Sequence, residues 1–267
     1  MKNRIITVVS NNLEKSLETK DLLVGKLLRA GFSVSDDLLP DTELIVSIGG
    51  DGSFLSTVRK FNYPEIPIVG INTGHLGFFP EIMPDKIDDF IEGYLNDSCI
   101  VQEVPILQAM ICTEQSCVDF YALNEIVVKG DKCRTLHLAL YVNNKKVENF
   151  SGDGMIICSQ TGSTAYSYSA GGSIIDYNVD VMQLTPLSPI NTNAYRSFTS
   201  SIIVPKDTDI RIIPEFRFED SVLIVIDGVE YRLKKISDIK VFTSDVKLKL
   251  LRLSDYEFWN RVSKKFL

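Results

Sequence analysis

Hydrophobic and polar positions follow two different patterns along the chain, and the change of pattern divides it in two. Up to about residue 100, short apolar runs alternate with segments whose apolar residues recur at helical spacing. The expected strands are Ile5–Val9, Leu44–Ile48 and Ile66–Ile71, and the expected helices are Leu13–Ala30, Ser53–Lys60 and Pro84–Leu95. Gly31 follows the first helix, where a C-cap glycine belongs. This alternation predicts a parallel sheet that binds ligands beyond the carboxyl ends of its strands.

Beyond Val101 the helical spacing is largely lost and short strand-like runs follow. They are Ile106–Cys112, Val118–Tyr121, Glu125–Lys129, Leu136–Val142, Met155–Ser159, Ser201–Val204, Asp209–Ile213, Val222–Ile226, Glu230–Leu233 and Ile239–Thr243. Val142–Lys145 and Ile226–Val229 are typical of hairpin turns. The pattern predicts an antiparallel, β-rich part with one helix at about Ser163–Ala170 and a helical tail at Asp255–Leu267.

We therefore expect two domains. Residues 1–100 form an α/β domain, residues 101–254 form a β-rich domain, and the tail 255–267 packs back on the first. The chain has 267 residues, of which 45% are hydrophobic, and this is enough for two modest cores.

The charge of the chain limits its partners. The formal net charge is -7 and no segment is dense in Lys and Arg, so phosphate neutralisation on a nucleic acid is disfavoured. The apolar run near the N-terminus is too short for a signal peptide, and no stretch approaches membrane-spanning length. We expect a cytoplasmic protein with no nucleic-acid and no membrane partner.

The cysteines and histidines indicate no metal centre. The five cysteines are scattered without a C-x-x-C, and an odd number in an intracellular chain predicts free thiols. His75 and His137 are the only histidines, so a zinc site of His and Cys ligands is not expected.

Two acidic turns are the most informative feature of the sequence. Gly50-Asp51-Gly52 follows an apolar strand, and Gly152-Asp153-Gly154 leads into another and then into the hydroxyl-rich run Thr161–Tyr166. Glycine allows positive φ and close approach of a ligand, and an aspartate on such a turn can meet a hydroxyl or a metal. Two such turns with the hydroxyl-rich run suggest a site for a phosphate-bearing nucleotide.

Each segment also has a purely structural interpretation. Gly49–Ser53 is either an ordinary capped helix start or a phosphate site built from backbone N–H groups, and its lack of lysine excludes a P-loop. Phe78 and Phe79, after the loop Asn72–Gly77, are either core residues or a wall for a planar base. Asn124-Glu125 could bind an adenine edge and ribose hydroxyls, but the dipeptide alone is uninformative. The small residues from Ser151 to Gly172 favour binding over packing.

Taken together, these segments closely resemble the NAD kinase family in its short bacterial form. The matching pieces are Gly49-Gly50-Asp51-Gly52, Asn72–Phe78, Asn124-Glu125 and Ser151 through Gly172, in the family's order. Gly-Gly-Asp-Gly is shared with lipid kinases and phosphofructokinases, whereas Thr161–Tyr166 followed by Ala170-Gly171-Gly172 is far more specific. The segment Pro186–Asn191 lacks the Pro-His element of many members.

The resemblance implies a Rossmann-like N-terminal α/β domain and a β-sandwich-like C-terminal domain. It implies transfer of the γ-phosphoryl of ATP, or of polyphosphate, to the 2′-hydroxyl of the adenosine ribose of NAD, giving NADP. Mg²⁺ would arrive largely on the nucleotide phosphates. The family assembles as dimers or tetramers, so a homo-oligomer is expected, and a homotetramer is the form we predict.

The resemblance also assigns residues. Asp51 would be the general base, and Gly49 and Gly50 would approach the phosphate donor. The residues expected to bind NAD are Gly52, Phe78, Phe79, Asn124, Glu125, Asp153, Ser163, Thr164, Ala165, Tyr166 and Ser169. Asp153 and Tyr166 would reach the site from a neighbouring chain.

Two other functions remain open from the sequence. One is a lipid or sugar kinase of the same superfamily, against which the lack of a basic patch argues. The other is a non-catalytic dinucleotide sensor, against which Asp51 argues because binding needs no base.

Overall fold

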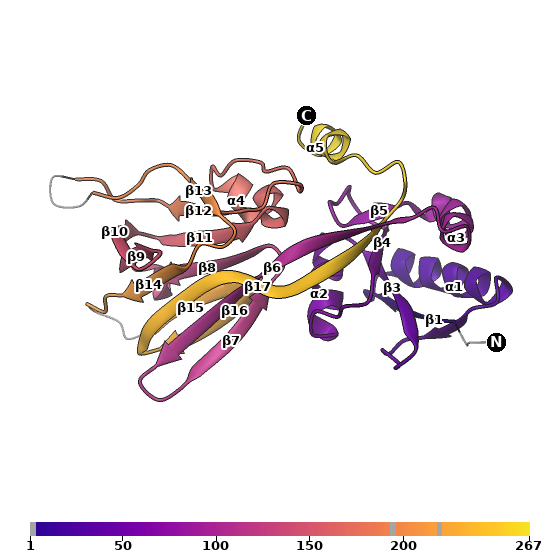
Figure 1. The fold of residues 1–267 in the computed structure, drawn as a ribbon, viewed down its shortest axis with the longest axis horizontal. Coiled ribbons are helices and arrows are strands. Elements are labelled where there is room, and N and C mark those ends of the chain that lie inside the picture. Colours follow the sequence, from indigo (N-terminus) through magenta and orange to yellow (C-terminus); the bar gives the residue numbers. More distant parts are fainter. Residues whose placement is uncertain (1–3, 193–195, 218–220) are drawn as a thin grey trace. The chain divides into compact units, whose positions relative to one another are not determined.

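The computed structural model describes residues 4–192, 196–217 and 221–267, and its chain divides into two compact units. The first unit comprises residues 1–104 and 246–267, and the second comprises residues 105–245. Two long strands, β6 (Ile100–Thr113) and β17 (Ile236–Arg252), run across the boundaries between the units (Figure 1). The C-terminal segment of the chain therefore belongs to the same unit as the N-terminal segment.

The first unit contains a parallel sheet in the order β17-β4-β3-β1-β2, with β5 paired to β4. Its strands are β1 (Ile5–Ser10), β2 (Ser33–Ser35), β3 (Thr42–Gly49), β4 (Ile68–Asn72) and β5 (Pro80–Ile82). Its helices are α1 (Glu14–Arg29), α2 (Asp51–Lys60), η1 (Pro84–Lys86), α3 (Ile87–Leu95) and α5 (Phe258–Phe266). The sequence did not indicate β2 and β5, because three residues are too few for a periodic pattern.

Helices cover both faces of this sheet. Leu44, Val46 and Ile48 of β3 share a core with residues of α1 and α3, so these two helices lie against one face. Side chains alternate along a strand, and Ser47 therefore points to the other face, where its hydroxyl bonds Thr57 of α2 at 2.9 Å. The expected α/β domain is confirmed.

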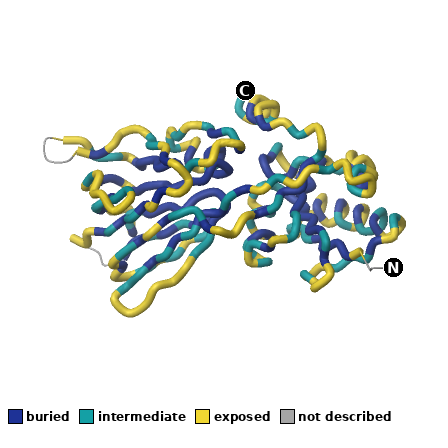
Figure 2. The backbone as a smooth tube through the Cα atoms, viewed as in Figure 1, coloured by how far each residue is buried: buried dark blue, intermediate teal, exposed yellow. Residues whose placement is uncertain are grey.

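The second unit is a β-sandwich. One sheet is antiparallel in the order β13-β12-β11-β8-β15-β16, and the other contains β10-β9-β14-β17, with β6 paired to β17 and β7. The remaining strands are β7 (Cys117–Ala122), β8 (Glu125–Gly130), β9 (Leu136–Val142), β10 (Lys145–Gly152), β11 (Gly154–Ser159), β12 (Val181–Leu187), β13 (Ile202–Pro205), β14 (Ile210–Pro214), β15 (Ser221–Ile226) and β16 (Val229–Lys234). Residues of both sheets form one core, and Figure 2 shows the buried residues concentrated on the strands.

Two strands and one helix of this unit differ from the sequence expectation. Strand β10 was missed because half of its residues are exposed, and β12 was missed because it contains Pro186 and buries polar side chains. The helix expected at about Ser163–Ala170 is present but shorter and divided. The structure has a 3-10 helix, η3 (Thr161–Thr164), and a short α-helix, α4 (Tyr166–Ser169), separated by Ala165.

The expectation that all cysteines are free thiols is also wrong. Cys112 and Cys117 are directly opposite on the β6–β7 hairpin and form a disulfide, whereas Cys99, Cys133 and Cys158 are free. Residues five apart come together here only because the hairpin pairs them, and the spacing alone did not indicate it.

Two features are absent from the described residues. No helix there is long and apolar enough to span a membrane. Within the same residues, no cluster of three or more His, Cys, Asp or Glu is arranged to hold a metal ion.

Candidate active site

The first acidic turn connects β3 to α2 in the first unit. Strand β3 ends at Gly49, Gly50 is the N-cap, and Asp51 is the first residue of the helix. A carboxylate is favoured at a helix N-terminus, where the free N–H groups and the helix dipole are positive. This position is also the carboxyl end of a strand in a parallel sheet, where such sheets bind ligands.

The two oxygens of the Asp51 carboxylate have different surroundings. Oδ1 accepts hydrogen bonds from the backbone N–H groups of Phe78 at 2.8 Å and Phe79 at 2.9 Å. Oδ2 lies 3.5 Å from the ammonium nitrogen of Lys265. The Asp51 side chain is 29% exposed, so one oxygen is fixed by backbone donors while the other has capacity for a further partner.

The loop that supplies these two N–H groups is held by cations on its carbonyl side. Lys265 and Arg261 of α5 donate to the carbonyl oxygens of Leu76 and Gly77 at 2.6 and 2.7 Å. Arg252 at the end of β17 also reaches the loop, within 3.5 Å of the carbonyl oxygen of Phe79. Aspartate on the N–H groups and cations on the carbonyls orient the peptide dipoles of the loop in one direction.

Gly77 is required by this arrangement. A Cβ at this position would lie 2.6 Å from Oδ1 of Asp51 and 2.9 Å from Cδ of Pro80. Real Cβ contacts are not this short, so a side chain here would displace the carboxylate or the loop.

The rings of Phe78 and Phe79 belong to the core of the first unit. Each residue is 3% exposed. Phe79 stacks on Phe54 of α2 with ring centroids 4.9 Å apart, and Phe78 lies 5.7 Å from the ring of Phe266. What these two residues present to Asp51 is therefore their backbone N–H groups.

The glycines of the first turn leave space beside the helix start. Gly49 has φ +149°, and a Cβ there would meet Oγ of Ser53 at 2.2 Å, whereas Gly50 and Gly52 have nothing within 4 Å of such an atom. A cavity of about 420 Å³ lies at this end of the sheet. Its lining includes Asn11, Gly52, Ser53 and Lys60.

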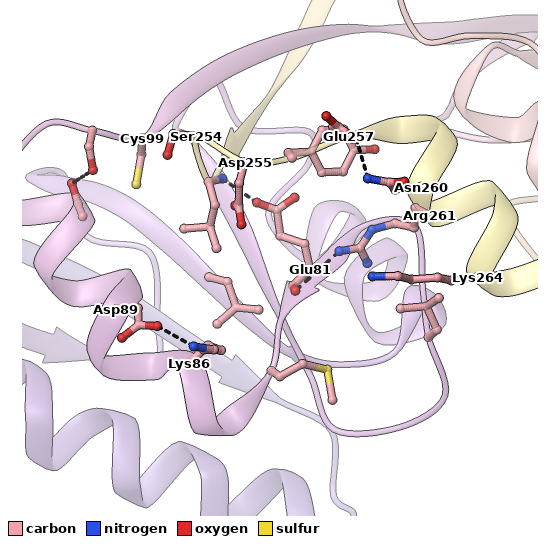
Figure 3. A pocket seen from close by; sticks show the side chains of 17 residues that line it. Glu81, Lys86, Asp89, Cys99, Ser254, Asp255, Glu257, Asn260, Arg261 and Lys264 are labelled. Atoms are coloured by element: carbon pink, nitrogen blue, oxygen red, sulfur yellow. Dashed lines mark hydrogen bonds and ion pairs between the residues drawn. The ribbon is translucent and has the colours of Figure 1, made fainter.

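A larger cleft of about 700 Å³ lies on the other side of the same loop (Figure 3). Its charged lining is of both signs, with Lys86, Arg261 and Lys264 near Glu81 and Asp89. Glu81 pairs with Arg252 at 3.1 Å, and although this partner opposes the effect, burial raises the pKa of the Glu81 carboxyl. Asp51 is not among the residues that line this cleft.

The second unit presents Asn124 and Glu125 at the turn between β7 and β8. The carboxylate of Asp227, in the β15–β16 hairpin, accepts from the N–H groups of Leu123, Asn124 and Glu125 at 2.7, 2.8 and 3.1 Å. The sequence indicated Asp227 only as a turn residue. In the structure it fixes the backbone of the dipeptide.

Both of these side chains have an oxygen without a protein partner. Asn124 and Glu125 are 5% and 7% exposed, and Oδ1 of the first and Oε2 of the second are buried with no hydrogen bond from the described residues. Oε1 of nearby Gln160 is in the same state. Unsatisfied buried polar atoms are costly, and a ligand that bonds them would remove the cost.

The carboxyl group of Glu125 is perturbed by these surroundings. Burial and, to a lesser extent, the nearby Asp227 carboxylate raise its pKa to about 8, although a hydrogen bond from the N–H of Tyr166 acts in the opposite direction. At neutral pH the group is therefore mainly protonated and can donate as well as accept a hydrogen bond.

The hydroxyl-rich run packs directly against this dipeptide. A Cβ on Gly162 would lie 2.1 Å from the carbonyl oxygen of Asn124, so only glycine permits the contact. Ser163 is fully buried and its Oγ is already bonded to the carbonyl oxygen of Gln160 at 2.7 Å, while Thr164 is 8% exposed. Ala165, Tyr166 and Ser169 are more accessible.

Asp153 is not brought to this cluster within the chain. It is exposed and connects β10 to β11, one residue before Gly154, which pairs with Lys129. At the other end of the same strand pair, Cys158 is opposite Glu125. Four residues of strand separate the two ends, or about 13 Å. The second acidic turn is therefore a link between sheets and is not equivalent to the first.

The sequence did not indicate four residues that organise these sites, namely Arg252, Arg261, Lys265 and Asp227. All are far in sequence from the residues they hold, and neither their spacing nor their type was distinctive. Only the helical tail was indicated, with no role for its cations. The sequence also departs from the family's Pro-His pattern in the segment from Pro186 to Arg196. Residues 193–195 of this segment lie outside the described residues.

Comparison with known proteins identifies the family. Sequence models of the ATP-NAD kinase N-terminal and C-terminal domains match residues 33–99 and 123–253. The chain is 36% identical to the NAD kinase of Finegoldia magna over 99% of its length and 98% of the relative's. It is 33% identical to the NAD kinase of Streptococcus gordonii over 100% and 97%.

Solved structures share the fold. A crystal structure of yeast NADH kinase complexed with NADH matches with a TM-score of 0.86 at 18% identity, covering 98% of this chain and 87% of that one. An NAD kinase from Archaeoglobus fulgidus in complex with ATP matches with a TM-score of 0.77 at 24% identity, covering 98% and 97%. With the whole-length sequence similarity, these matches establish that the chain belongs to the NAD kinase family.

Proposed function

We propose that this protein is an NAD kinase that transfers the γ-phosphoryl of ATP, or a phosphoryl of polyphosphate, to the 2′-hydroxyl of the adenosine ribose of NAD. The observation that supports the proposal most directly is the asymmetric environment of Asp51. One carboxylate oxygen is held by two backbone N–H groups, and the other can accept a hydroxyl proton.

In this mechanism Asp51 is the general base. Oδ2 takes the proton of the 2′-hydroxyl while the ribose oxygen bonds to the γ-phosphorus and the bond to the leaving ADP oxygen breaks. Phosphoryl transfer needs little covalent help from a protein, so the rate depends on positioning and charge. The two N–H groups hold the carboxylate in one orientation and thereby supply part of that positioning.

The adenosine end of NAD is assigned to the cluster around Asn124 and Glu125. Their unpartnered oxygens provide acceptors for the adenine amino group and a ribose hydroxyl. The adjoining segment is also assigned to NAD, through Thr164, Ala165, Tyr166 and Ser169. The Ser163 hydroxyl holds the backbone of this segment by its hydrogen bond to the carbonyl oxygen of Gln160. Gly52, Phe78 and Phe79 complete the NAD assignment, the two phenylalanines through their backbone.

The phosphate donor is assigned to Gly49 and Gly50 at the start of α2. The open space at Gly50 and the free N–H groups of the helix start suit phosphate oxygens. Mg²⁺ enters as part of the magnesium–ATP substrate and offsets the phosphate charge. Oxygen ligands of the phosphates suit this ion, and the described residues offer no cluster of their own for it.

We further propose that the protein is a cytoplasmic homo-oligomer, a dimer or a tetramer. The support for an oligomer is the position of Asp153, which is exposed and is separated from Glu125 by about 13 Å along the strand pair. Asp153 would therefore contribute to the NAD site of another copy of the chain.

The test is an assay of purified protein with NAD, ATP and Mg²⁺, in which NADP is detected by a dehydrogenase specific for it. The matched variant is Asp51→Asn. Asparagine keeps an oxygen to accept the N–H groups of Phe78 and Phe79, but it cannot take a proton. We expect normal folding, NAD binding close to wild type, and a loss of about 10²- to 10⁴-fold in kcat.

Each other outcome has a definite meaning. Wild-type turnover by Asp51→Asn removes Asp51 from the mechanism. NAD binding without NADP formation by the wild type identifies a dinucleotide sensor. Neither binding nor turnover with NAD directs the search to lipid and sugar acceptors.

A further inference from the structure

The last turn of α5 places an ammonium group at the Asp51 carboxylate. Nζ of Lys265 lies 3.5 Å from Oδ2 of Asp51 and 2.6 Å from the carbonyl oxygen of Leu76. It also lies 5.4 Å from the centre of the Phe78 ring. A single cation therefore contacts the proposed base, the loop that holds this base, and an aromatic face of the same loop.

These contacts distinguish Lys265 from an ordinary surface ion pair. Isolated exposed pairs contribute little, because two flexible side chains must be ordered. Here the helix itself is anchored, since Phe258 and Val262 are buried and Arg261 bonds the carbonyl oxygens of Gly77 and Pro80. The Lys265 side chain is 30% exposed, and its backbone position is fixed by the packing of α5.

The geometry leaves Oδ2 able to meet a substrate. Oδ1 is occupied by two N–H groups, and a carboxylate oxygen has two acceptor positions. At 3.5 Å the ammonium is beyond the usual hydrogen-bond distance, so it orients Oδ2 without taking the place of a hydroxyl.

We propose that Lys265 is a positioning residue for phosphoryl transfer, acting through Asp51. It holds Oδ2 in the direction from which the ribose hydroxyl approaches, and it keeps the 76–79 loop against the carboxylate. When Oδ2 gains the hydroxyl proton, Asp51 becomes neutral and the positive charge of Lys265 remains next to the anionic phosphates. This role rests on the proposed NAD kinase function and deepens it.

The variant that tests the proposal is Lys265→Met, which keeps the length of the side chain and removes its charge. The matched control is Lys264→Met on the same helix turn, because Lys264 lines the separate cleft shown in Figure 3. The conservative variant is Lys265→Arg. We expect Lys265→Met to lower kcat by about tenfold with less than about a twofold change in KM for NAD. Lys265→Arg should keep most of the rate, and Lys264→Met should match the wild type.

A double-mutant cycle distinguishes action through Asp51 from a structural effect. If Lys265 acts through the carboxylate, Lys265→Met should change kcat by less than about twofold in an Asp51→Asn background. Lys265→Met should remain folded, with a melting temperature lowered by no more than a few degrees through loss of the bond to the Leu76 carbonyl oxygen.

The opposite results overturn the proposal. One such result is that Lys265→Met has the kcat of the wild type. Another is that Lys264→Met loses as much of its kcat as Lys265→Met. The third is that Lys265→Met lowers kcat by the same tenfold factor in the Asp51→Asn background. If the wild type forms NADP and Asp51→Asn does not, such results refute the role of Lys265 alone. Absence of NADP formation by the wild type refutes the proposed function and this role with it.

Discussion

Substitution of Gly77 by alanine tests the hypothesis that backbone geometry holds the base. The added Cβ would lie 2.6 Å from Oδ1 of Asp51, whereas ordinary contacts begin at 3.4 Å. The oxygen must therefore move by about 0.8 Å, and Pro80 on the other side, at 2.9 Å, limits relaxation of the loop.

The size of the effect follows from the two hydrogen bonds at Oδ1. Each is a backbone N–H bonded to a carboxylate, and bonds to charged groups contribute about 1.5–3 kcal/mol. Partial loss of both should lower the free energy of unfolding by about 2–4 kcal/mol. A displacement approaching 1 Å at the reacting group should lower kcat by about 10²-fold.

The assay compares kcat, KM for NAD and urea denaturation of Gly77→Ala with those of the wild type. The control is Gly25→Ala in α1, where the added methyl meets nothing closer than 4.0 Å. The control should keep full activity and gain about 0.5–1 kcal/mol in stability, because alanine suits a helix better than glycine. A Gly77→Ala enzyme with normal kcat would refute the hypothesis that the 78–79 N–H groups position the base.

The remaining predictions concern the second unit. Burial raises the pKa of Glu125 from 4.5 to about 8, so the folded state holds a proton that the unfolded state releases between these values. The contribution of this proton to the free energy of unfolding is fully present below pH 4.5 and is lost as the pH rises through about 8. In urea titrations at several pH values, Glu125→Gln should reduce this loss of stability. An unchanged pH dependence in the variant would contradict the assignment. Cys112→Ser combined with Cys117→Ser should lower the free energy of unfolding by about 2 kcal/mol without reductant and much less with it. Thiol titration of unreduced, denatured wild type should detect three thiols, and five would refute the disulfide.

Local patterns in the sequence were enough for most regular elements. The continuous apolar run Leu44–Ile48 indicates a strand buried on both faces, and the helical spacing in Leu13–Ala30 indicates a helix buried on one face, so a single segment reports each element directly. The Asp227-Gly228 hairpin was likewise predictable, because both residues adopt positive φ. Strands β10 and β12 could not be predicted, because their buried and exposed residues do not alternate with the two-residue period of a strand.

The sequence by itself also determined the family, since the motifs around Asp51, Asn124 and Thr161 are local and appear in order. Only the tertiary structure decided what holds these residues. The partners of Asp51 are 27, 28 and 214 positions away, and those that Asp227 holds are more than 100 positions away. Such contacts depend on how strands and the terminal helix pack, and no local pattern of residues specifies them. The physical reason is that a hydrogen bond requires proximity in space, whereas periodicity reports only which face of a segment is buried.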